Sequence, residues 1–418
     1  MTSSACDLRI AEGLLTERLA GLAAIGADPA GGVTRLAYTP EDVRARDTVA
    51  GWMKAAGLQV WVDEAANLFG RLPGSDPQAG ALLSGSHLDS VVRAGAFDGP
   101  AGVLSALAAA EALRASGRRL RHDLVVVAFG NEEGTRGTPG MVGSKAVAGL
   151  LTPQDLARPG EGGVTLAERI RAAGGVPERI SGAAWSPDRV AGFVELHIEQ
   201  GPVLEGAGAR IGVVSGITGQ VGVTVAIRGA TNHAGTTPMG HRRDAAVAAA
   251  EIVLAVQALA VQDRVRVATT GILGVGPGVR NVIAGEAVVG IDIRDDDSRR
   301  IAAALAHLEQ QVADIGRRTG TLIDWAPTPV QPPVPTDRRL AGHIADAADA
   351  LGARWLELSS GAGHDAQVMS AIGPTAMVFV PSRGGVSHAP EEATDPDDLV
   401  LGADVLLRAL LAADADLP

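Results

Sequence analysis

Short apolar runs alternate with helical segments over the first half of the chain. The runs at 81–86 (ALLSGS), 124–129 (LVVVAF) and 190–196 (VAGFVEL) have the length and composition of buried strands. Residues 101–117 separate the first two runs and have the apolar pattern of a helix that ends at Gly117, and residues 41–56 form a further predicted helix. This order predicts an α/β fold with a central, mostly parallel sheet and crossover helices.

The pattern changes near residue 211, where strand-rich and helical segments follow each other without a chemical motif at each strand end. A chain of 418 residues is also longer than one hydrophobic core usually organises, so two domains are expected. The Pro-rich segment 326–337 then connects back to a strand predicted at 375–380 (TAMVFV). We therefore predict a catalytic domain over 1–210 and 329–418, interrupted by a smaller α/β sandwich over 211–328.

Composition excludes several classes of partner. The formal net charge of −12 disfavours an extended nucleic-acid or anionic-membrane surface. Cys6 is the only cysteine, which leaves no intrachain disulfide and fits a reducing compartment. The first residues lack the pattern of a secretory signal, and no apolar run approaches the length of a membrane span. A cytoplasmic protein without membrane or nucleic-acid partners is expected.

Histidine or carboxylate side chains follow each predicted strand of the first domain. They are His87 and Asp89 in SHLDS, Glu132 and Glu133 in NEEG, His197 in ELHIEQG, and His388 in SHAPEE. Ligands of parallel sheets bind beyond the carboxyl ends of the strands. A single such residue is more often an ordinary exposed residue without a functional role, and we interpret His122, His307 and His343 in this way. Four strand ends that carry such groups together predict a metal site.

Asp98 lies on a Gly-rich loop, GAFDGPAG, directly before the predicted helix. Its carboxylate could bridge two ions, because each oxygen can bind one. Three histidines and two carboxylates form a nitrogen and oxygen ligand set suited to zinc, manganese, cobalt or nickel. Of the adjacent pair Glu132 and Glu133, one could bind metal while the other moves a proton. Asp89 is placed to hold the ring of His87.

At these residues the chain resembles the M20-type metal-dependent amidohydrolases. It is similar to the branch that contains N-carbamoyl-L-amino-acid hydrolase, β-ureidopropionase and allantoate amidohydrolase. The resemblance runs in order from about residue 80 to 392. The strings that carry it are GSHLDSVVRAGAFDG, NEEGTR, VELHIEQGPVLE, TNHAGTTPM, NVIAGEAVVGIDIR, SGAGHDA and SHAPEE. It implies an aminopeptidase-like catalytic domain, a lid or dimerisation domain, a homodimer and two divalent metal ions.

The resemblance also implies a role for each matched residue. His87, Asp98 and His197 would surround one ion, and Asp98, Glu133 and His388 the other. Glu132 would be the general base and acid. The remaining implied roles are His233 in catalysis and substrate binding, with Gln200, Asn281 and Arg294 in substrate binding. His364, in GAGHDA, is expected near the site, as a substrate contact or as a structural hydrogen bond.

Two of these assignments have simpler alternatives. Arg294 lies within DIRDDD, where it could merely pair with acidic neighbours, and His233 could be an ordinary turn residue in a Thr-rich loop. The chain also departs from the family pattern, with Gly137 in place of an aromatic residue and Ala284 in place of a proline. The first departure removes bulk near the rim of the site and weakens inference about the substrate side chain.

The expected function is hydrolysis of the ureido C–N bond of N-carbamoyl-L-amino acids, a small-molecule reaction that yields the amino acid, ammonia and carbon dioxide. Allantoate, ureidoglycolate and N-carbamoyl-β-alanine present the same ureido and carboxylate groups and stay open as alternatives. N-acyl amino acids or peptides are less favoured by the HIEQGPVLE match. A catalytically silent binding or scaffolding protein would have lost the base or a ligand, and both are present. The Gly-rich strings lack the strand–GxGxxG–helix context of a nucleotide-binding fold.

Overall fold

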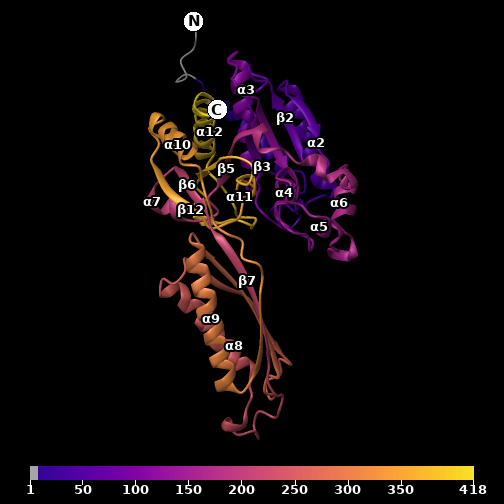
Figure 1. Cartoon of the computed structure of the whole chain (residues 1–418), viewed down its shortest axis with the longest axis vertical. Helices are drawn as coiled ribbons and strands as arrows, with labels where there is room; N and C mark the ends of the chain where they lie inside the picture. Colours follow the sequence, from indigo (N-terminus) through magenta and orange to yellow (C-terminus); the bar gives the residue numbers. More distant parts are fainter. Residues whose placement is uncertain (1–7) are drawn as a thin grey trace. The chain divides into compact units, whose positions relative to one another are not determined.

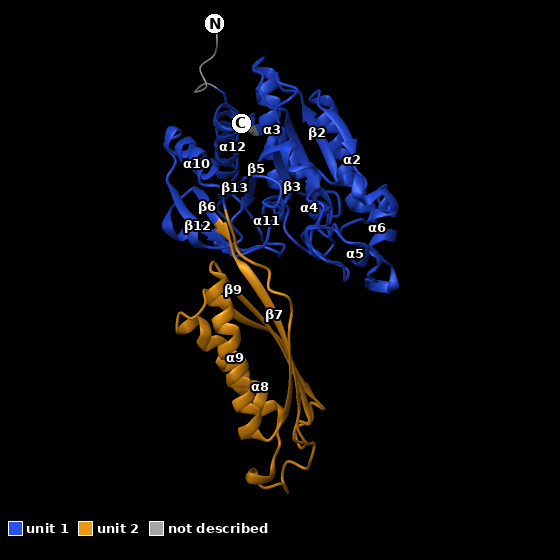
Figure 2. Cartoon of the chain, in the orientation of Figure 1, with its two compact units in different colours: residues 1–215, 336–418 blue, residues 216–335 orange. Residues whose placement is uncertain are grey.

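The computed structural model describes residues 8–418, which divide into two compact units (Figures 1 and 2). Unit 1 runs to Ser215 and resumes at Thr336, and unit 2 spans Gly216–Pro335. The sequence pattern placed these boundaries at residues 211 and 328. The first boundary differs because residues 211–217 form a strand that pairs with the sheet of unit 1. Cys6 lies outside the described residues.

The large sheet has the strand order β1-β2-β4-β3-β5-β13-β6-β11, with β12 also paired to β6. Its middle strands β4, β3, β5 and β13 are mutually parallel, and the flanking pairings of β1, β2, β6 and β11 are antiparallel. The strands are β1 (Gln59–Val62), β2 (Leu68–Leu72), β3 (Ala81–His87), β4 (Leu124–Phe129), β5 (Val190–Ile198), β6 (Ile211–Ile217), β11 (Val334–Pro335), β12 (Trp355–Ser360) and β13 (Thr375–Val380).

Helices cover the parallel strands, whose side chains are almost all buried. The helices of unit 1 are α1 (Glu12–Ala23), α2 (Pro40–Ala55), α3 (Pro100–Ala115), α4 (Val142–Val147), α5 (Pro153–Ala157), α6 (Leu166–Ala172), α7 (Val203–Ala207), α10 (Arg338–Ala350), α11 (Asp365–Met369) and α12 (Pro396–Asp416), with short 3₁₀ turns at Glu161–Gly163, Pro177–Ala183, Pro187–Arg189 and Arg383–Gly385. Within residues 8–418, no helix combines the length and apolarity that crossing a membrane requires.

The main core lies between one face of the sheet and helices α1, α2, α3, α10 and α12. Alternate side chains of β4, namely Leu124, Val126 and Ala128, belong to this core. Alternation follows from strand geometry, in which successive side chains point to opposite faces. Helix α3 packs against β3, β4 and β5, so it fixes the position of the loop that precedes it.

Gly102 allows the first turn of α3 to approach the sheet closely. A Cβ at this position would clash with the carbonyl oxygen of Leu196 and would lie 2.9 Å from Cβ of Ser86. We expect Gly102→Ala to lower the free energy of unfolding by about 1–3 kcal/mol, because the added methyl overpacks this contact. Chemical denaturation measures the change.

Gly51 provides the matched control in α2. It is exposed, and nothing lies within 4 Å of a Cβ built there. Gly51→Ala should raise the free energy of unfolding by about 0.5–1 kcal/mol, since alanine has the higher helix propensity. Equal effects of the two substitutions would contradict the packing argument.

The expectation that His122 lies on the surface is wrong, because its side chain is fully buried. Its Nδ1 lies 2.9 Å from Oδ1 of Asp414, and its Nε2 lies 3.0 Å from the carbonyl oxygen of Pro418. The side chain thereby ties the segment before β4 to the end of α12. Sequence reasoning missed it because its partners lie almost 300 residues away.

Unit 2 is a two-layer α/β sandwich with an antiparallel sheet of order β10-β7-β9-β8. Its elements are β7 (Gly219–Arg228), a 3₁₀ turn (Met239–His241), α8 (Ala245–Val261), β8 (Val267–Gly276), β9 (Glu286–Asp295), α9 (Ser298–Thr319) and β10 (Leu322–Pro327). Every second residue of β7 is buried. The buried side chains lie on the face of the sheet that the two helices cover, and together with the helices they form a separate core.

Candidate metal centre

Four strand ends and one loop bring the predicted ligands to one edge of the large sheet. His87 is the last residue of β3, and His197 is the penultimate residue of β5. Glu133 follows β4, His388 follows β13, and Asp98 lies just before α3. Because β4, β3, β5 and β13 are parallel, their carboxyl ends meet at this edge.

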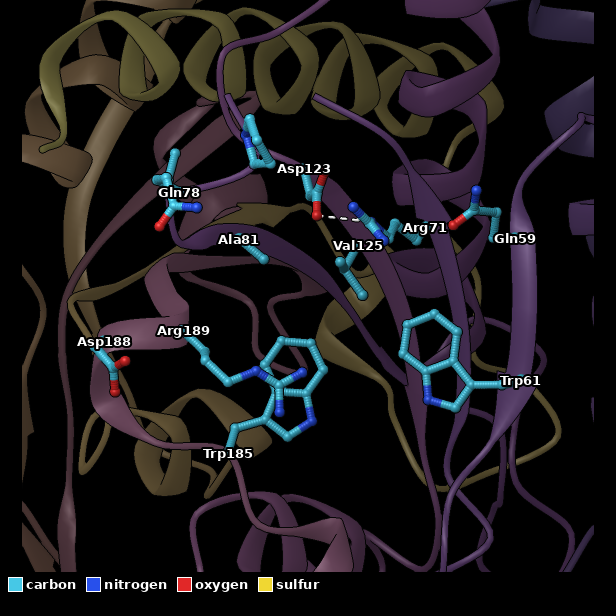
Figure 3. Close-up of a pocket in the computed structure, with 12 residues that line it drawn as sticks. Gln59, Trp61, Arg71, Gln78, Ala81, Asp123, Val125, Trp185, Asp188 and Arg189 are labelled. Atoms are coloured by element: carbon cyan, nitrogen blue, oxygen red, sulfur yellow. Dashed lines mark ion pairs between the residues drawn. The ribbon is translucent and has the colours of Figure 1, made fainter. Parts of the chain in front are cut away.

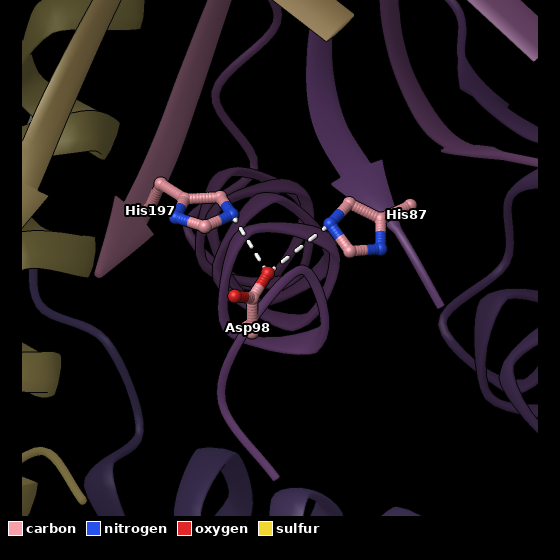
Figure 4. A group of neighbouring side chains, drawn as sticks. All are labelled: His87, Asp98 and His197. Carbon is pink, nitrogen blue, oxygen red and sulfur yellow. Dashed lines mark ion pairs between the residues drawn. The ribbon is translucent and has the colours of Figure 1, made fainter. Parts of the chain in front are cut away.

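The carboxylate of Asp98 is the centre of the cluster. Nε2 of His87 and Nε2 of His197 both lie 3.3 Å from its Oδ1, and Figure 4 shows the two rings converging on that oxygen. On the other side, Nε2 of His388 lies 3.3 Å from Oδ2 and 3.5 Å from Oε2 of Glu133. Asp98 therefore belongs to two groups of ligands, one on each oxygen.

These distances fit metal binding. Two ligand atoms that bind one zinc ion tetrahedrally, each about 2.0–2.1 Å from the metal, lie about 3.3–3.4 Å apart. Each of the two groups has its ligand atoms within 4.8 Å of one another. Oε1 of Glu133 is also buried without a hydrogen-bond partner, as expected of an oxygen reserved for a cation. The residues present thus suit two divalent ions that share Asp98.

The charges in the cluster favour an ionised carboxylate between imidazoles. Burial opposes ionisation of Asp98, but His197, His388 and His87 together hold its pKa well below the usual range. The hydrogen bond to Asp98 raises the pKa of His388 to about 9. A centre with this concentration of negative charge and imidazole nitrogen attracts divalent cations.

Backbone carbonyls orient the two histidines that end strands. Nδ1 of His87 lies 2.9 Å from the carbonyl oxygen of Asp89, and Nδ1 of His197 lies 2.9 Å from that of Ile198. Each contact places the ring proton on Nδ1 and leaves Nε2 as the metal-binding atom. Gly99 has a φ of 81°, and its missing side chain makes room for the ring of His87.

Asp89 acts mainly on the turn that carries the two glutamates. Its carboxylate oxygens accept hydrogen bonds from the backbone N–H of Glu132, at 3.2 Å, and of Glu133, at 3.3 Å. Its own contact to the ring of His87 comes through the backbone carbonyl, whereas the carboxylate stays 3.8 Å from Nδ1. Asp89 therefore couples the ends of β3 and β4.

Glu132 lies beside the cluster without belonging to either ligand group. Its Oε2 is 3.9 Å from Nε2 of His87. Burial raises its pKa well above the usual range, His87 opposes the shift, and Asp365 and Glu133 reinforce it. A carboxyl group with a raised pKa next to a metal cluster is suited to accept and return a proton.

His364 lies beside the proposed ligand His197, and the sequence alone leaves two roles open for it. The two rings meet edge to face with centroids 4.5 Å apart, and Nε2 of His364 lies 2.8 Å from Oγ of Ser360. Burial, reinforced by His197, keeps the pKa of His364 well below the usual range. Of the two expected roles, a substrate contact and a structural hydrogen bond, this environment fits the structural hydrogen bond.

Two buried glutamates were missed by sequence reasoning. Glu195 bonds Oγ of Ser86 at 2.6 Å and the backbone N–H of Ala366 at 3.1 Å. Glu392 contacts the loops that carry Asp98 and His388. The only signal in the sequence was their position in strings already singled out, VELH and SHAPEE. Their partners are far along the chain and become visible only in the fold.

Gln200 lies within unit 1 at the same edge. Its Nε2 is 2.6 Å from Oδ2 of Asp98, and its backbone has a left-handed φ of 60°. Its Oε1 is buried and has no hydrogen-bond partner. An amide in this position is suited to contact a substrate bound at the cluster.

The other predicted substrate residues lie in unit 2. The backbone N–H of Ala234 bonds the carbonyl oxygen of Asn281 at 3.0 Å, so the loops of His233 and Asn281 are adjacent. Nδ1 of His233 accepts the N–H of Gly235 at 3.0 Å. Arg294 pairs with Asp292 through Nε at 2.7 Å and Nη2 at 3.2 Å, so the acidic pairing considered above does occur.

A cavity of about 470 Å³ lies at the opposite, amino ends of the strands (Figure 3). Trp61, Trp185, Arg71 and Asp123 are among the residues that line it, and Arg71 and Asp123 form an ion pair of 2.6 Å. None of the predicted ligands or catalytic residues lines this cavity. The reactive groups of unit 1 are gathered at the other edge.

The fold and the site together define a metal-dependent hydrolase. The chain belongs to the peptidase family M20/M25/M40, whose pattern matches residues 83–412. This match and the α/β architecture confirm the predicted family, fold class and hydrolase class.

Known relatives define the branch of the family. The chain is 41% identical to the N-carbamoyl-L-amino acid amidohydrolase of Geobacillus stearothermophilus, over 95% of this chain and 97% of that protein. It is 37% identical to the allantoate amidohydrolase of Escherichia coli strain K12, over 95% and 96% of the two chains. The crystal structure of a hydantoinase/carbamoylase-family amidase from Burkholderia multivorans superposes with a TM-score of 0.90 at 36% identity, covering 98% of this chain and 100% of the other.

Proposed function

We propose that the protein hydrolyses the ureido C–N bond of N-carbamoyl-L-amino acids and releases the L-amino acid, ammonia and carbon dioxide. The observation that carries the proposal is the two-sided cluster on Asp98 with Glu132 beside it. The relatives named N-carbamoyl-L-amino acid amidohydrolase support the choice of bond. One water is consumed: its oxygen becomes the second oxygen of carbon dioxide, and its two protons go to the amino acid nitrogen and to ammonia.

We assign metal binding to His87, Asp98, Glu133, His197 and His388, with Asp98 shared between two divalent ions. Zinc, manganese, cobalt and nickel all suit this nitrogen and oxygen ligand set. When bound, such ions acidify water and polarise a carbonyl oxygen. The protein's own contribution is to hold the five ligands in place through the backbone contacts of His87 and His197 and the carboxylate of Asp89.

Glu132 is the proposed general base and acid. Its carboxylate would take a proton from the attacking water and deliver it to the leaving nitrogen. Its position 3.9 Å from Nε2 of His87 places it beside the ligands rather than among them. The hydrogen bond from its backbone to Asp89 fixes the turn on which it lies.

Residues of unit 2 would bind the substrate in this proposal, with unit 2 acting as a lid. Because Nδ1 of His233 accepts a backbone N–H, the proton of the neutral ring is on Nε2, where it can be donated to the ureido oxygen. Asp292 orients the guanidinium of Arg294, which suits it to grip a carboxylate together with Asn281. Gln200 would contact the same substrate from unit 1.

A substrate panel tests this proposal. The purified, metal-loaded protein would be assayed for ammonia with N-carbamoyl-L-amino acids, their D-isomers, N-carbamoyl-β-alanine, allantoate and ureidoglycolate. Free amino acid would be measured as well, because N-acetyl amino acids and a dipeptide, the remaining substrates of the panel, release no ammonia. The highest kcat/KM is expected for an N-carbamoyl-L-amino acid. A higher value for allantoate or ureidoglycolate would instead assign to this protein the activity for which its relatives allantoate amidohydrolase or ureidoglycolate hydrolase are named. Turnover of the peptide alone would refute the ureido assignment.

We also propose a cytoplasmic homodimer that forms through unit 2. Strand β8 is an edge of the unit 2 sheet, and its sequence VATTGILGVG has no charged residue. Ile272 and Leu273 on this strand are 63% and 57% exposed. An uncharged, apolar edge strand is a template for pairing with a second strand. The opposite edge, β10, carries Asp324 in an ion pair with Arg228.

Ile272→Lys is therefore expected to convert the dimer to a monomer, because a charge on the edge strand opposes strand pairing. Sedimentation velocity measures the change. Leu322→Lys, on the opposite edge strand, is the matched control and should leave the dimer intact, since Leu322 is similarly exposed at 69%. A dimer unaffected by Ile272→Lys would place the interface elsewhere.

A further inference from the structure

We propose that Glu392 is a positioning residue that fixes Asp98 and His388, and thereby sets the affinity of the ion that these two residues would share with Glu133. The inference rests on the two-ion centre of the proposed function. It assigns a role to a residue outside the ligand set.

The carboxylate of Glu392 joins two loops that are far apart in the sequence. Its Oε1 accepts the backbone N–H of Phe97 at 3.0 Å and that of Asp98 at 3.1 Å. Its Oε2 accepts the backbone N–H of His388 at 3.3 Å and lies 2.8 Å from the hydroxyl Oγ of Ser387, which also lies 3.0 Å from Oδ2 of Asp98. One oxygen therefore serves the loop of Asp98 and the other serves the loop of His388.

The surroundings of Glu392 show that this contact is built into the fold. The residue is only 5% exposed, and Gly95 has no side chain where a Cβ would collide with the carboxylate. His388 has a left-handed φ of 56°, a conformation that a non-glycine residue adopts only when its surroundings hold it. The hydrogen bond from its N–H to Glu392 supplies part of that hold.

The two ligand groups differ in how they are supported. His87 and His197 belong to β3 and β5, two adjacent buried strands of the sheet. His388 lies in a loop, and its side chain is 47% exposed. The strand-borne histidines do not depend on Glu392 for their position. Asp98 is a ligand of both ions, but the ion at His87 and His197 keeps two ligands that do not depend on Glu392. Loss of Glu392 should therefore weaken the ion at His388 more than the ion at His87 and His197.

A carboxylate is required because both oxygens of Glu392 accept hydrogen bonds. In Glu392→Gln the amide keeps one acceptor oxygen, while its NH₂ group faces N–H donors of one loop and cannot accept from them. One of the two loops thus loses its backbone hydrogen bonds to residue 392, and on the His388 side only the hydroxyl of Ser387 can accept a hydrogen bond from the amide. Residues that hold metal ligands typically contribute about 10–100-fold to metal affinity.

The test is a zinc titration of the metal-free protein against a competing chelator, with metal content measured by mass spectrometry. Wild type should bind two ions. Glu392→Gln should bind one ion about 10–100-fold more weakly. It should bind the other with a smaller loss of affinity, because Asp98 is a ligand of both. Glu199→Gln is the matched control, because Glu199 also accepts two backbone N–H groups, from Val203 and Leu204, but contacts no ligand of the cluster.

Hydrogen exchange on the metal-free proteins gives a second readout. Glu392→Gln should exchange faster than wild type in the peptides that contain residues 95–99 and 383–392, and nowhere else. Ser387→Ala removes the contact of Oγ to Glu392 at 2.8 Å and its contact to Oδ2 of Asp98 at 3.0 Å, leaves the three backbone hydrogen bonds of Glu392 in place, and should weaken the same ion to a smaller extent. This milder variant provides the measurement if Glu392→Gln fails to fold.

Four outcomes decide the proposal. Selective weakening of one ion supports it. Two ions bound as tightly as in wild type, or equal weakening of both ions together with faster exchange throughout the protein, overturns it. A wild-type protein that binds fewer than two ions refutes the two-ion centre itself, and this result is recognised without any variant.

Discussion

Glu132→Gln should lower kcat for the preferred ureido substrate by about 10²–10⁴-fold, the range that a positioned general acid and base contributes. The amide is nearly the same size as the carboxylate but cannot accept the proton of water. Glu132 lies outside both ligand groups, so the metal content of the variant should equal that of wild type. Steady-state kinetics and metal analysis of the same preparation measure the two quantities.

Glu161→Gln is the control for this substitution. Glu161 lies in the 3₁₀ turn Glu161–Gly163, where its backbone N–H bonds the carbonyl oxygen of Arg136 at 2.8 Å, and its side chain is 69% exposed. Its variant should keep both the activity and the metal content of wild type. If Glu132→Gln retained a tenth or more of the wild-type kcat, another group would have to be the base.

Asp98→Asn should abolish measurable activity and remove at least one of the two ions. Only one atom of an amide is an acceptor, so its NH₂ group must face either the histidine pair at the Oδ1 position or His388 and Glu133 at the Oδ2 position. The loss should exceed the 10–100-fold that is typical of residues outside the ligand set. Metal content after dialysis and the ammonia assay check the two parts.

Asp123→Asn is the matched control at the other end of the sheet. Asp123 pairs with Arg71 at 2.6 Å and lines the cavity at the amino ends of the strands (Figure 3). Its variant should bind two ions and turn over substrate as wild type does. An Asp98→Asn protein that held two ions with wild-type affinity would show that Asp98 is not a ligand shared by the two ions.

The elements that position the site could be predicted from the sequence because they are long and uniformly buried. The predicted runs at 124–129 and 375–380 coincide with β4 and β13, and those at 81–86 and 190–196 end within two residues of β3 and β5. The ligands follow from these strands, since the parallel order brings their ends together. Strands β1 and β12 have mixed exposure and no clear alternation, and were therefore missed.

The contacts that organise the ligands could not be predicted, because they join residues that are far apart in the sequence. Glu392 bonds the backbone of Asp98, and His122 bonds Asp414, in each case across almost 300 residues. No local pattern distinguishes such a buried polar residue from one on the surface. The first boundary of unit 2 could not be predicted for a similar reason. Strand β6 pairs with β13, and almost all of unit 2 lies between these two strands in the sequence.

Reconstitution of the metal-free protein shows whether two metal ions and hydrolysis of a ureido bond belong together in this enzyme. Protein treated with a chelator would be titrated with zinc or manganese in the presence of an N-carbamoyl-L-amino acid, while ammonia and free amino acid are measured together. We expect no turnover without metal, a rise to a plateau at two ions per chain, and one ammonia for each amino acid released. Full turnover by the metal-free protein, or no ammonia from any ureido carboxylate at any metal loading, would refute the two-ion ureido hydrolase.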